Sequence, residues 1–508
     1  MFFTWAAQTE KPELMKRAVP CLLLVFLLTA GLVTPARAQV GHKNQYSYTY
    51  DYWGDIRFAP DAYRVRMVVN SSSLGLDRSM AVPGSLFAQQ DRLYIVDSGN
   101  NRILQLKGSK GSFAVERIID GFIDRGFPGT FRNPSDVFVT EEGDLFICDT
   151  GNERVLKMDS DLNLLLTLTK PLDETFDQRT AFLPVKVVAD VTGRAFVLVR
   201  NVNKGLAKFE SNGQFTGFIG AMPVSYSIAD QVWRLLSTRQ QREQQASFVP
   251  TEFDNVYIDP RGFIYSVTTT FQEYDLIWDV ARPIRKLNAV GSDILVKNGE
   301  FPPIGDIDWG TAAGYSGPSK FSDITVLENE VYVALDKTRG RLFAYDDQGR
   351  NLFIFGGSGN MAGYFRNAVS IEHTGYELLV LDSLEASVTI FEPTEYGRLI
   401  YRATEEYQRG EYALSAQSWQ RVLELNGNFE LACIGVGRAL LREERYEEAM
   451  RYFKLANDEV NYSKAFQEQR KIWVEQNIGW IFAAIAAALA VPLAAGRIKR
   501  IREELQEA

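Results

Sequence analysis

The sequence contains very little histidine and cysteine, and each shortage excludes a class of chemistry. His42 and His373 are the only histidines, so a Ser-His-Asp triad or a histidine-rich metal site has almost no residues to use. Of the three cysteines, Cys21 lies in an apolar N-terminal stretch, while Cys148 and Cys433 lie in segments expected to belong to different domains. We therefore expect no disulfide, and a cysteine zinc site is excluded by number.

Long runs of one charge are also missing. The 64 acidic and 55 basic residues are interspersed and give a formal net charge of −9, which provides no basic surface for nucleic acid. Hydrophobic residues make up 46% of the 508 positions, enough for two or more domains with substantial cores. We expect a folded protein that does not bind nucleic acid.

An apolar stretch lies near the N-terminus. Lys16 and Arg17 precede it, and it is followed by the small residues Ala36 and Ala38. This order is typical of a secretory signal peptide, which we place at residues 1–38. The alternative is a retained N-terminal membrane helix, for which the stretch is short.

A second apolar stretch lies near the C-terminus. The 19 residues from Ile478 to Gly496 carry no charge and are followed at once by clustered arginine and lysine. The length fits one transmembrane helix at 477–496, and the positive cluster favours a cytoplasmic tail at 497–508. A buried alanine-rich helix is the alternative. With the signal peptide, this predicts a single-pass cell-membrane protein with an extracytoplasmic body.

A repeat occupies the middle of the chain. LYIVDSGNNRIL at 93–104 returns as LFICDTGNERVL at 145–156, and Asp336 and Arg341 keep the same five-residue offset. Weaker copies fill the intervals and bring the number of units to six. Each unit has the pattern of four short strands with alternating apolar positions, separated by Gly, Asn and Asp turns. Such units are typical of propeller blades.

We interpret the repeated Asp and Arg as scaffold. A carboxylate at this position can accept hydrogen bonds from the amides of the turn, and the arginine can reach back to a carboxylate or carbonyl of its own or the next blade. Gly99 and Gly151, next to the Asp in two copies, are expected to take positive φ.

The pattern resembles the NHL-repeat six-bladed β-propeller, which is related in shape to gluconolactonase-like and paraoxonase-like propellers. The resemblance implies a mainly β fold with six blades over residues 71–392. Residues 39–70 precede it as an extension, and we hypothesise that its end, around Tyr63 to Val69, closes the ring against 365–392. A plain extension is the alternative. An insertion at 225–250 has helical spacing and is either a helix capping one face or a surface loop.

After Pro393 the apolar period changes from two to about 3.6. Residues 405–456 resemble tetratricopeptide repeats, with small residues where paired helices cross and large ones between them. About one and a half to two repeats predict a small α-helical domain at 393–476 that serves as a spacer or docking platform. Its last helix, at 462–476, leads into the predicted span.

One repeated position supplies a candidate site of six polar residues. Aligning the units and applying propeller symmetry predicts that these residues ring one mouth of the channel: Ser85, Asp136, Lys186, Asn255, Asp323 and Ser370. The ring can bind a ligand or act as a structural polar plug. Asp136, Asn255 and Asp323 also resemble the metal site of gluconolactonase-like propellers, with oxygen ligands that suit Ca²⁺ or another divalent cation. Lys186 departs from that pattern because it adds a positive charge.

Two functions are consistent with these features. The first, which we favour, is a membrane-anchored extracytoplasmic binding or scaffold protein that recognises a carbohydrate, a peptide or a partner membrane protein. It needs no cofactor and no catalytic residues. The second is a metal-dependent, lactonase-like hydrolase in which the ion polarises a lactone carbonyl. A bound divalent ion that is lost in Asp136→Ala or Asp323→Ala would distinguish the second from the first.

Overall fold

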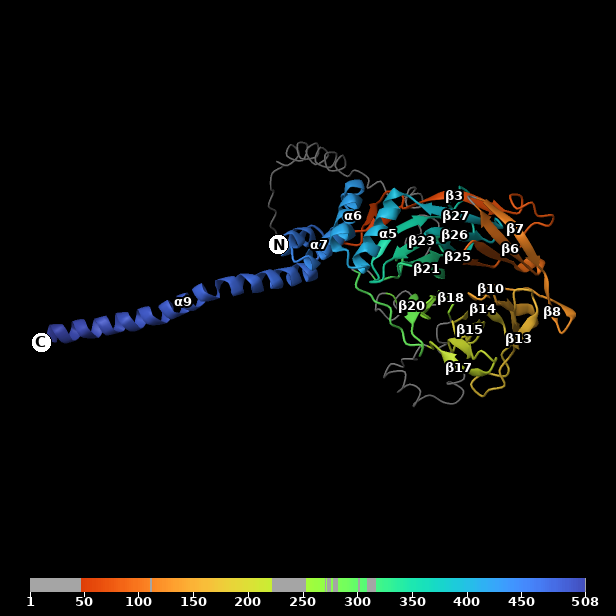
Figure 1. Ribbon diagram of the computed structural model, residues 1–508, viewed down its shortest axis with the longest axis horizontal. Coiled ribbons are helices and arrows are strands. Elements are labelled where there is room, and N and C mark those ends of the chain that lie inside the picture. Colours follow the sequence, from red (N-terminus) through yellow and green to blue (C-terminus); the bar gives the residue numbers. More distant parts are fainter. Residues whose placement is uncertain are drawn as a thin grey trace, which may run out of the picture.

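A computed structural model describes residues 47–109, 112–221, 253–269, 271, 276, 282–299, 302–307 and 317–507. The predicted signal peptide and the insertion at 225–250 lie outside these residues. Within them the chain is mainly β: a six-bladed propeller is followed by five helices, the last of them long and apolar. Figure 1 looks along the channel, with the inner strands of the blades around the centre.

Blades 1 to 3 are regular four-stranded antiparallel sheets, as the repeat predicts. Their strands, from the channel outward, are β4 (Ser85–Gln89), β5 (Arg92–Asp97), β6 (Arg102–Ser109) and β7 (Ser112–Ile119) in blade 1; β10 (Asp136–Val139), β11 (Leu145–Asp149), β12 (Arg154–Met158) and β13 (Leu164–Leu168) in blade 2; and β14 (Pro184–Ala189), β15 (Ala195–Val199), β16 (Leu206–Phe209) and β17 (Phe215–Ile219) in blade 3. A hairpin of β8 (Gly121–Asp124) and β9 (Phe127–Thr130) connects the first two blades.

Blades 4 to 6 depart from the simple repeat. Their strands are β18 (Asn255–Ile258), β19 (Ile264–Val267) and β20 (Ile284–Leu287) in blade 4; β21 (Phe321–Val326), β22 (Tyr332–Asp336), β23 (Arg341–Tyr345) and β24 (Asn351–Gly356) in blade 5; and β25 (Ala368–Thr374), β26 (Glu377–Asp382), β27 (Ser387–Pro393) and β3 (Tyr63–Asn70) in blade 6. Blade 4 has three strands in the described chain, and in place of a fourth strand a single β-bridge joins Leu287 to Asp293. Blade 5 gains two outer strands, β1 (Tyr48–Tyr50) and β2 (Ile56–Phe58).

The ring is closed by the strand hypothesised from the sequence. β3 pairs antiparallel with β27 from Tyr63 opposite Pro393 to Asn70 opposite Ser387. Six hydrophobic clusters fill the spaces between neighbouring blades, and the cluster between blades 5 and 6 extends into the helices. Because each blade buries both faces, removal of one blade would expose apolar surface on two others.

The repeated Asp and Arg stabilise the turns, which confirms their role as scaffold. Asp97 accepts hydrogen bonds from the Ala81 amide and from the Arg102 guanidinium, both at 2.7 Å. Asp149 likewise accepts hydrogen bonds from the Arg132 amide at 2.7 Å and from the Arg154 guanidinium at 2.8 Å. In these two blades the amide donor belongs to the segment that enters the blade rather than to the turn itself. Each carboxylate therefore ties the entering segment to the second and third strands.

The positive φ expected at the two glycines is wrong. The left-handed residues of these turns are Asn101 and Glu153, with φ of 55° and 53°. Glycine is needed for a different reason: a Cβ at Gly99 would lie 2.6 Å from the carbonyl oxygen of Ala81, and at Gly151 the equivalent contact is 2.5 Å. The entering segment therefore passes too close to the turn for any larger residue.

The third copy of the motif uses its arginine differently. Arg341 donates to the Tyr48 hydroxyl at 2.6 Å and to the Asp306 carboxylate, while Ser319 donates to Asp336 at 2.8 Å. Tyr48 belongs to β1, which pairs with β24. The five-residue offset is kept, but the arginine now ties the N-terminal hairpin to blade 5.

Two antiparallel helix pairs follow the propeller. The helices are α5 (Glu395–Gln408), α6 (Tyr412–Leu425), α7 (Glu430–Arg442), α8 (Tyr446–Leu455) and α9 (Glu459–Glu507). A Cβ at Gly435 would lie 2.5 Å from the Trp419 ring, and one at Gly437 would lie 2.6 Å from the Phe453 ring. The small residues therefore let the helices approach closely, as the repeat pattern predicts.

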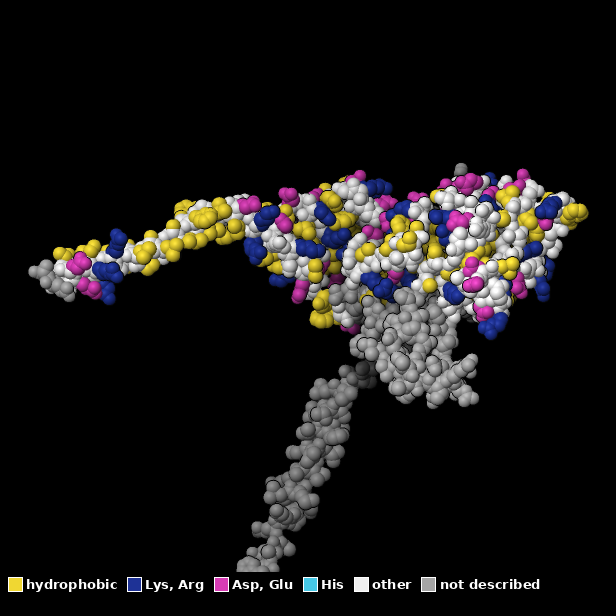
Figure 2. Space-filling view, turned by 90° about the horizontal axis from the view of Figure 1, so that it is seen from below, with side chains coloured by type: hydrophobic (Ala, Val, Ile, Leu, Met, Phe, Trp, Pro, Cys, Tyr) yellow, Lys and Arg dark blue, Asp and Glu magenta, His cyan; other side chains and the backbone are white. Residues whose placement is uncertain are grey.

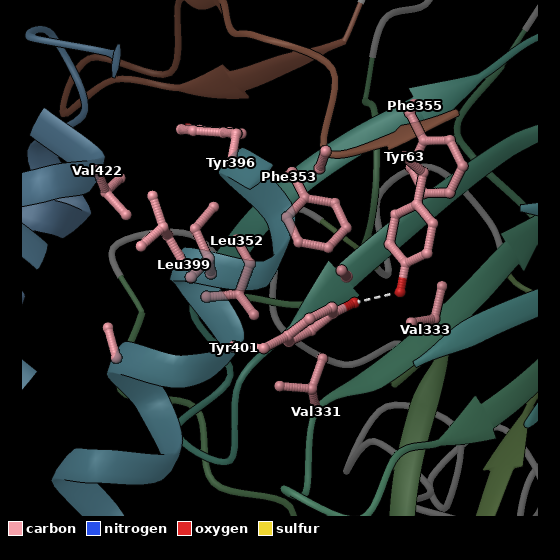
Figure 3. Close-up of a cluster of buried hydrophobic side chains, with 14 of the residues drawn as sticks. Tyr63, Val331, Val333, Leu352, Phe353, Phe355, Tyr396, Leu399, Tyr401 and Val422 are labelled. Atoms are coloured by element: carbon pink, nitrogen blue, oxygen red, sulfur yellow. Dashed lines mark hydrogen bonds between the residues drawn. The ribbon is translucent and has the colours of Figure 1, made fainter. Parts of the chain in front are cut away.

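The helices dock on the blade that closes the ring. The hydroxyls of Tyr63 on β3 and Tyr401 on α5 lie 2.8 Å apart in the shared core, which Figure 3 shows. Thr394 caps α5 and donates its amide to the Ala62 carbonyl at 2.9 Å. Gly397 lies over the same carbonyl. The first helix and the closing strand are therefore held by one joint.

The last helix is a single element rather than three. The predicted segments at 462–476 and 477–496 and the described part of 497–508 are continuous within α9, which runs from Glu459 to Glu507 and includes Pro492. Its apolar stretch is exposed to solvent and is long enough to cross a membrane once. Figure 2 shows hydrophobic side chains along much of its length, with Lys and Arg gathered near the far end.

Gly397→Ala should destabilise the protein by about 1–3 kcal/mol, because it overpacks the joint between propeller and helices. The added Cβ would lie 2.3 Å from the Ala62 carbonyl oxygen. Gly427→Ala is the control, because its Cβ would meet nothing closer than 3.7 Å. Chemical denaturation of both variants provides the measurement. Equal stability of the two variants would contradict the close packing of Gly397 against the Ala62 carbonyl.

Candidate functional site

The six predicted ring residues are each the first or third residue of an innermost strand, and five of them are linked across blades. In blades 1 to 3, the Ser85 hydroxyl donates to Asp136 at 2.7 Å, and the Lys186 ammonium lies 3.0 Å from the same carboxylate. Asp136 also accepts the Val187 amide at 2.9 Å. Ser85 and Asp136 are buried, and Lys186 is 12% exposed.

The other half of the ring repeats this linkage. Ser370 donates its hydroxyl to Asp323 at 2.8 Å, and the Ile371 amide donates to the same oxygen. The Leu86 amide donates to the Ser370 hydroxyl at 3.2 Å, which joins blade 1 to blade 6. Asn255 differs, since its carboxamide accepts the amide of the next residue in its own strand. The ring residues therefore connect neighbouring blades through buried hydrogen bonds.

The charges in the ring influence one another. Burial raises the pKa of both Asp136 and Asp323, and the Lys186 ammonium opposes that shift. The pKa of Lys186 is raised, because the attraction of the nearby carboxylates outweighs the desolvation that lowers it. The lysine is therefore held charged between two buried carboxylates.

A cavity of about 230 Å³ extends along the channel from the ring. Lys186 and Asp323 line its inner end, and the turns after the innermost strands of blades 2 to 4 line the other end, including residues 140–142, 190–191, 259–260 and 262. Phe87, Phe138 and Tyr257 line the cavity between these ends. Two of the six ring residues, Lys186 and Asp323, therefore border this cavity, and the other four are not among its lining residues.

Glu372 is a functional candidate that the sequence analysis missed. It lies two residues after Ser370 on β25, lines the cavity and is 6% exposed. Burial raises its pKa to about 8, an effect that Lys186 opposes and Asp323 reinforces. The sequence could have identified Glu372, because successive side chains of a strand alternate between its two faces, so the residue two positions after a ring residue lies on the same face. In blades 1 and 2 this position holds Phe87 and Phe138.

The proposed metal ligands do not form a metal site. Among the residues that the structure describes, no three acidic, histidine or cysteine side chains lie close enough together to hold a metal ion. Lys186 lies against Asp136, where a bound cation would need that carboxylate, and the oxygens of Asp323 accept bonds from Ser370 and from two backbone amides. This donor set fits a divalent ion poorly.

No family model and no curated protein matches the sequence. Solved structures resemble the propeller at low identity. Virginiamycin B lyase from Staphylococcus aureus is 9% identical, with a TM-score of 0.38 over 65% of this chain and 99% of that one. A putative gluconolactonase is 10% identical, with a TM-score of 0.38 over 69% and 98%. BamB from Moraxella catarrhalis is 9% identical, with a TM-score of 0.31 over 61% and 84%. These resemblances describe shape alone.

Lys186→Met should destabilise the protein by about 3–5 kcal/mol, because it leaves a buried carboxylate without its counter-charge. Denaturation at pH 7 measures the loss. The loss should shrink as the pH falls: without the lysine the folded-state pKa of Asp136 rises further, and the protonated carboxyl carries no penalty.

Lys208→Met in the same blade is the control. Lys208 lies 3.1 Å from Glu210 near the surface and is 23% exposed, so its loss should cost less than about 1 kcal/mol. A similar cost for both lysine variants would contradict the buried ion pair.

Glu372→Gln should make stability less dependent on pH. The folded-state pKa of Glu372 is about 8, above the ordinary value of 4.5. As the pH rises from 4.5 to about 8, the unfolded chain loses this proton while the folded protein keeps it, so the wild type loses stability. The variant lacks this loss and should be the more stable protein at pH 8 but not at pH 4.5. Parallel pH profiles would contradict a buried neutral carboxyl.

Proposed function

We propose that this protein is a membrane-anchored, extracytoplasmic binding and scaffold protein. Its blades fit NHL-type repeats, its helix pairs fit tetratricopeptide-type repeats, and α9 supplies the single span. The partner is a carbohydrate, a peptide or another membrane protein. One observation carries the proposal: the propeller, the helix pairs and α9 are joined through continuous packing rather than through a linker.

The packing extends without interruption from the propeller to α9. Gln408 of α5 donates to the Asn329 carbonyl of blade 5 at 3.0 Å, and the Tyr376 hydroxyl of blade 6 donates to Glu405. The same hydrophobic cluster includes Ala465 of α9. A unit built in this way holds a binding surface at a fixed position relative to the bilayer, which a flexible linker would not do.

The long helix leaves the edge of the propeller rather than one of its faces. Figure 1, which looks along the channel, shows α9 extending sideways from the ring, and Figure 2 agrees. A bilayer crossed by α9 would therefore face the rim of the propeller rather than an end of its channel. The clustered Arg497, Lys499, Arg500 and Arg502 support a cytoplasmic C-terminus.

The metal-dependent lactonase function has less support from the geometry, because the ring carboxylates are already bonded. It predicts a different result: the purified protein should contain a divalent ion that is absent from both the Asp136→Ala and the Asp323→Ala variants. Metal analysis together with a panel of lactones tests this. An ion with turnover would replace the binding function with an enzymatic one.

A membrane-impermeant maleimide should label Leu172→Cys in intact cells, and Glu503→Cys only after the membrane is opened. Leu172 is 96% exposed on the propeller, and Glu503 lies beyond the apolar stretch of α9. The native Cys148 and Cys433 are buried and should give little background. Gel mobility or mass measures the labelling.

The unaltered protein controls for background labelling. A version lacking residues 478–508 should leave the membrane fraction at high pH, whereas the full chain should remain in it. Labelling of Glu503→Cys in intact cells, or release of the full chain at high pH, would contradict the proposed topology.

A further inference from the structure

We propose that the channel cavity binds a small organic ammonium ion, held by the Glu372 carboxylate and by the aromatic rings that line the cavity. The inference rests on the proposed binding function but not on the membrane anchor. The proposed site borders the ring through Lys186 and Asp323, whose side chains are already bonded to their neighbours, and adds Glu372 and the aromatic residues of the wall.

Three aromatic side chains line the wall of the cavity. Phe87 and Phe138, on neighbouring blades, lie with ring centroids 5.1 Å apart and are only half-buried, because they border the cavity. Tyr257 lines the wall of blade 4, with its ring 6.2 Å from that of His373. Aromatic faces attract cations, most strongly where water is excluded, and such walls suit alkylated ammonium groups.

The inner end of the cavity has an excess of negative groups. The carboxyls of Asp136, Asp323 and Glu372 all interact electrostatically with one ammonium, that of Lys186, and Lys186, Asp323 and Glu372 line the cavity. Lys186 bonds to Asp136 and Ser85, and within the described chain no side chain donates a hydrogen bond to Glu372. If all three carboxyls ionise, the cluster lacks two positive charges. A cationic ligand would supply one.

Glu372 takes up a proton in the absence of a ligand, since burial raises its pKa to about 8. The titratable and charged groups that approach it are Asp136 on β10, Lys186 on β14, Tyr257 on β18, Asp323 on β21 and His373 on β25. Burial raises the pKa of Tyr257 and lowers that of His373 to about 4, so both are neutral at pH 7. An ammonium ligand would displace the Glu372 proton, which passes to the buffer.

The other end of the cavity favours entry of cations. Glu141, Glu142, Asp190 and Asp259 line it. Asp190 and Asp259 are bonded within their own turns, whereas Glu141 and Glu142 are exposed to solvent. Acidic groups around an opening raise the local concentration of cations. The size also fits, because an apolar cavity of about 150 Å³ holds a benzene molecule, and this cavity is about 230 Å³.

Isothermal titration calorimetry of the purified full chain in detergent tests the inference, with choline as the probe at pH 7. Choline should bind, and the heats measured in phosphate and in Tris should differ by the amount expected for proton release. 3,3-Dimethylbutan-1-ol has the same shape without the charge and should bind at least tenfold more weakly. Both results follow from charge pairing in a dry, aromatic cavity.

Glu372→Gln should weaken choline binding at least tenfold and remove the buffer dependence of the heat. Glu385→Gln in the same blade is the control, because Glu385 is exposed and pairs with Arg366. Phe138→Leu keeps the cavity apolar and should also weaken binding. The proposal is overturned if choline gives no heat at millimolar concentration, if the neutral alcohol binds equally well, or if Glu372→Gln binds as the wild type does. Calcium binding at Glu372 in place of choline would also overturn it.

Discussion

The contact between β3, β27 and α5 is the constraint on which the rest of the structure depends. β3 comes from residues 63–70 and β27 from residues 387–393, so their pairing closes a ring of more than three hundred residues. The cost of closing so long a loop grows only slowly with its length, but specific contacts must offset it. Thr394, bonded to the Ala62 carbonyl, and Tyr401, bonded to Tyr63, add such contacts from α5. Ring closure and helix docking are therefore mutually stabilising.

The polar ring of the channel also joins neighbouring blades. At three blade junctions, a backbone amide at the start of one innermost strand donates to the ring side chain of the preceding blade. A polar residue at this position thus satisfies an amide that would otherwise be buried without a partner. This makes the ring part of the scaffold and leaves the cavity beyond it as the place where a ligand can add interactions. Repetition in the sequence alone did not separate these two roles.

Local patterns predicted the parts of the molecule that depend on local physics. Alternating apolar residues predicted the blades, and small residues at helical spacing predicted the close crossing at Gly435. The closing strand followed from the requirement that the ring leave no exposed sheet edge. Features that depend on contacts between distant segments could not be predicted from the sequence. Gly99 is required by a passing carbonyl, Arg341 is redirected by the added β1, and the environment of Glu372 depends on residues from several blades.

The position of Glu372 shows why a buried carboxyl argues for a ligand. The equivalent position in the other five units holds Phe87, Phe138, Val188, Tyr257 and Thr325, none of which carries a charge. A carboxyl costs free energy there, whether it is desolvated as an anion or kept neutral by a proton. Packing alone would be served better by an apolar residue. The same exclusion of water that raises the Glu372 pKa strengthens its attraction to a cation, so the unfavourable burial becomes favourable only when a positive group occupies the cavity.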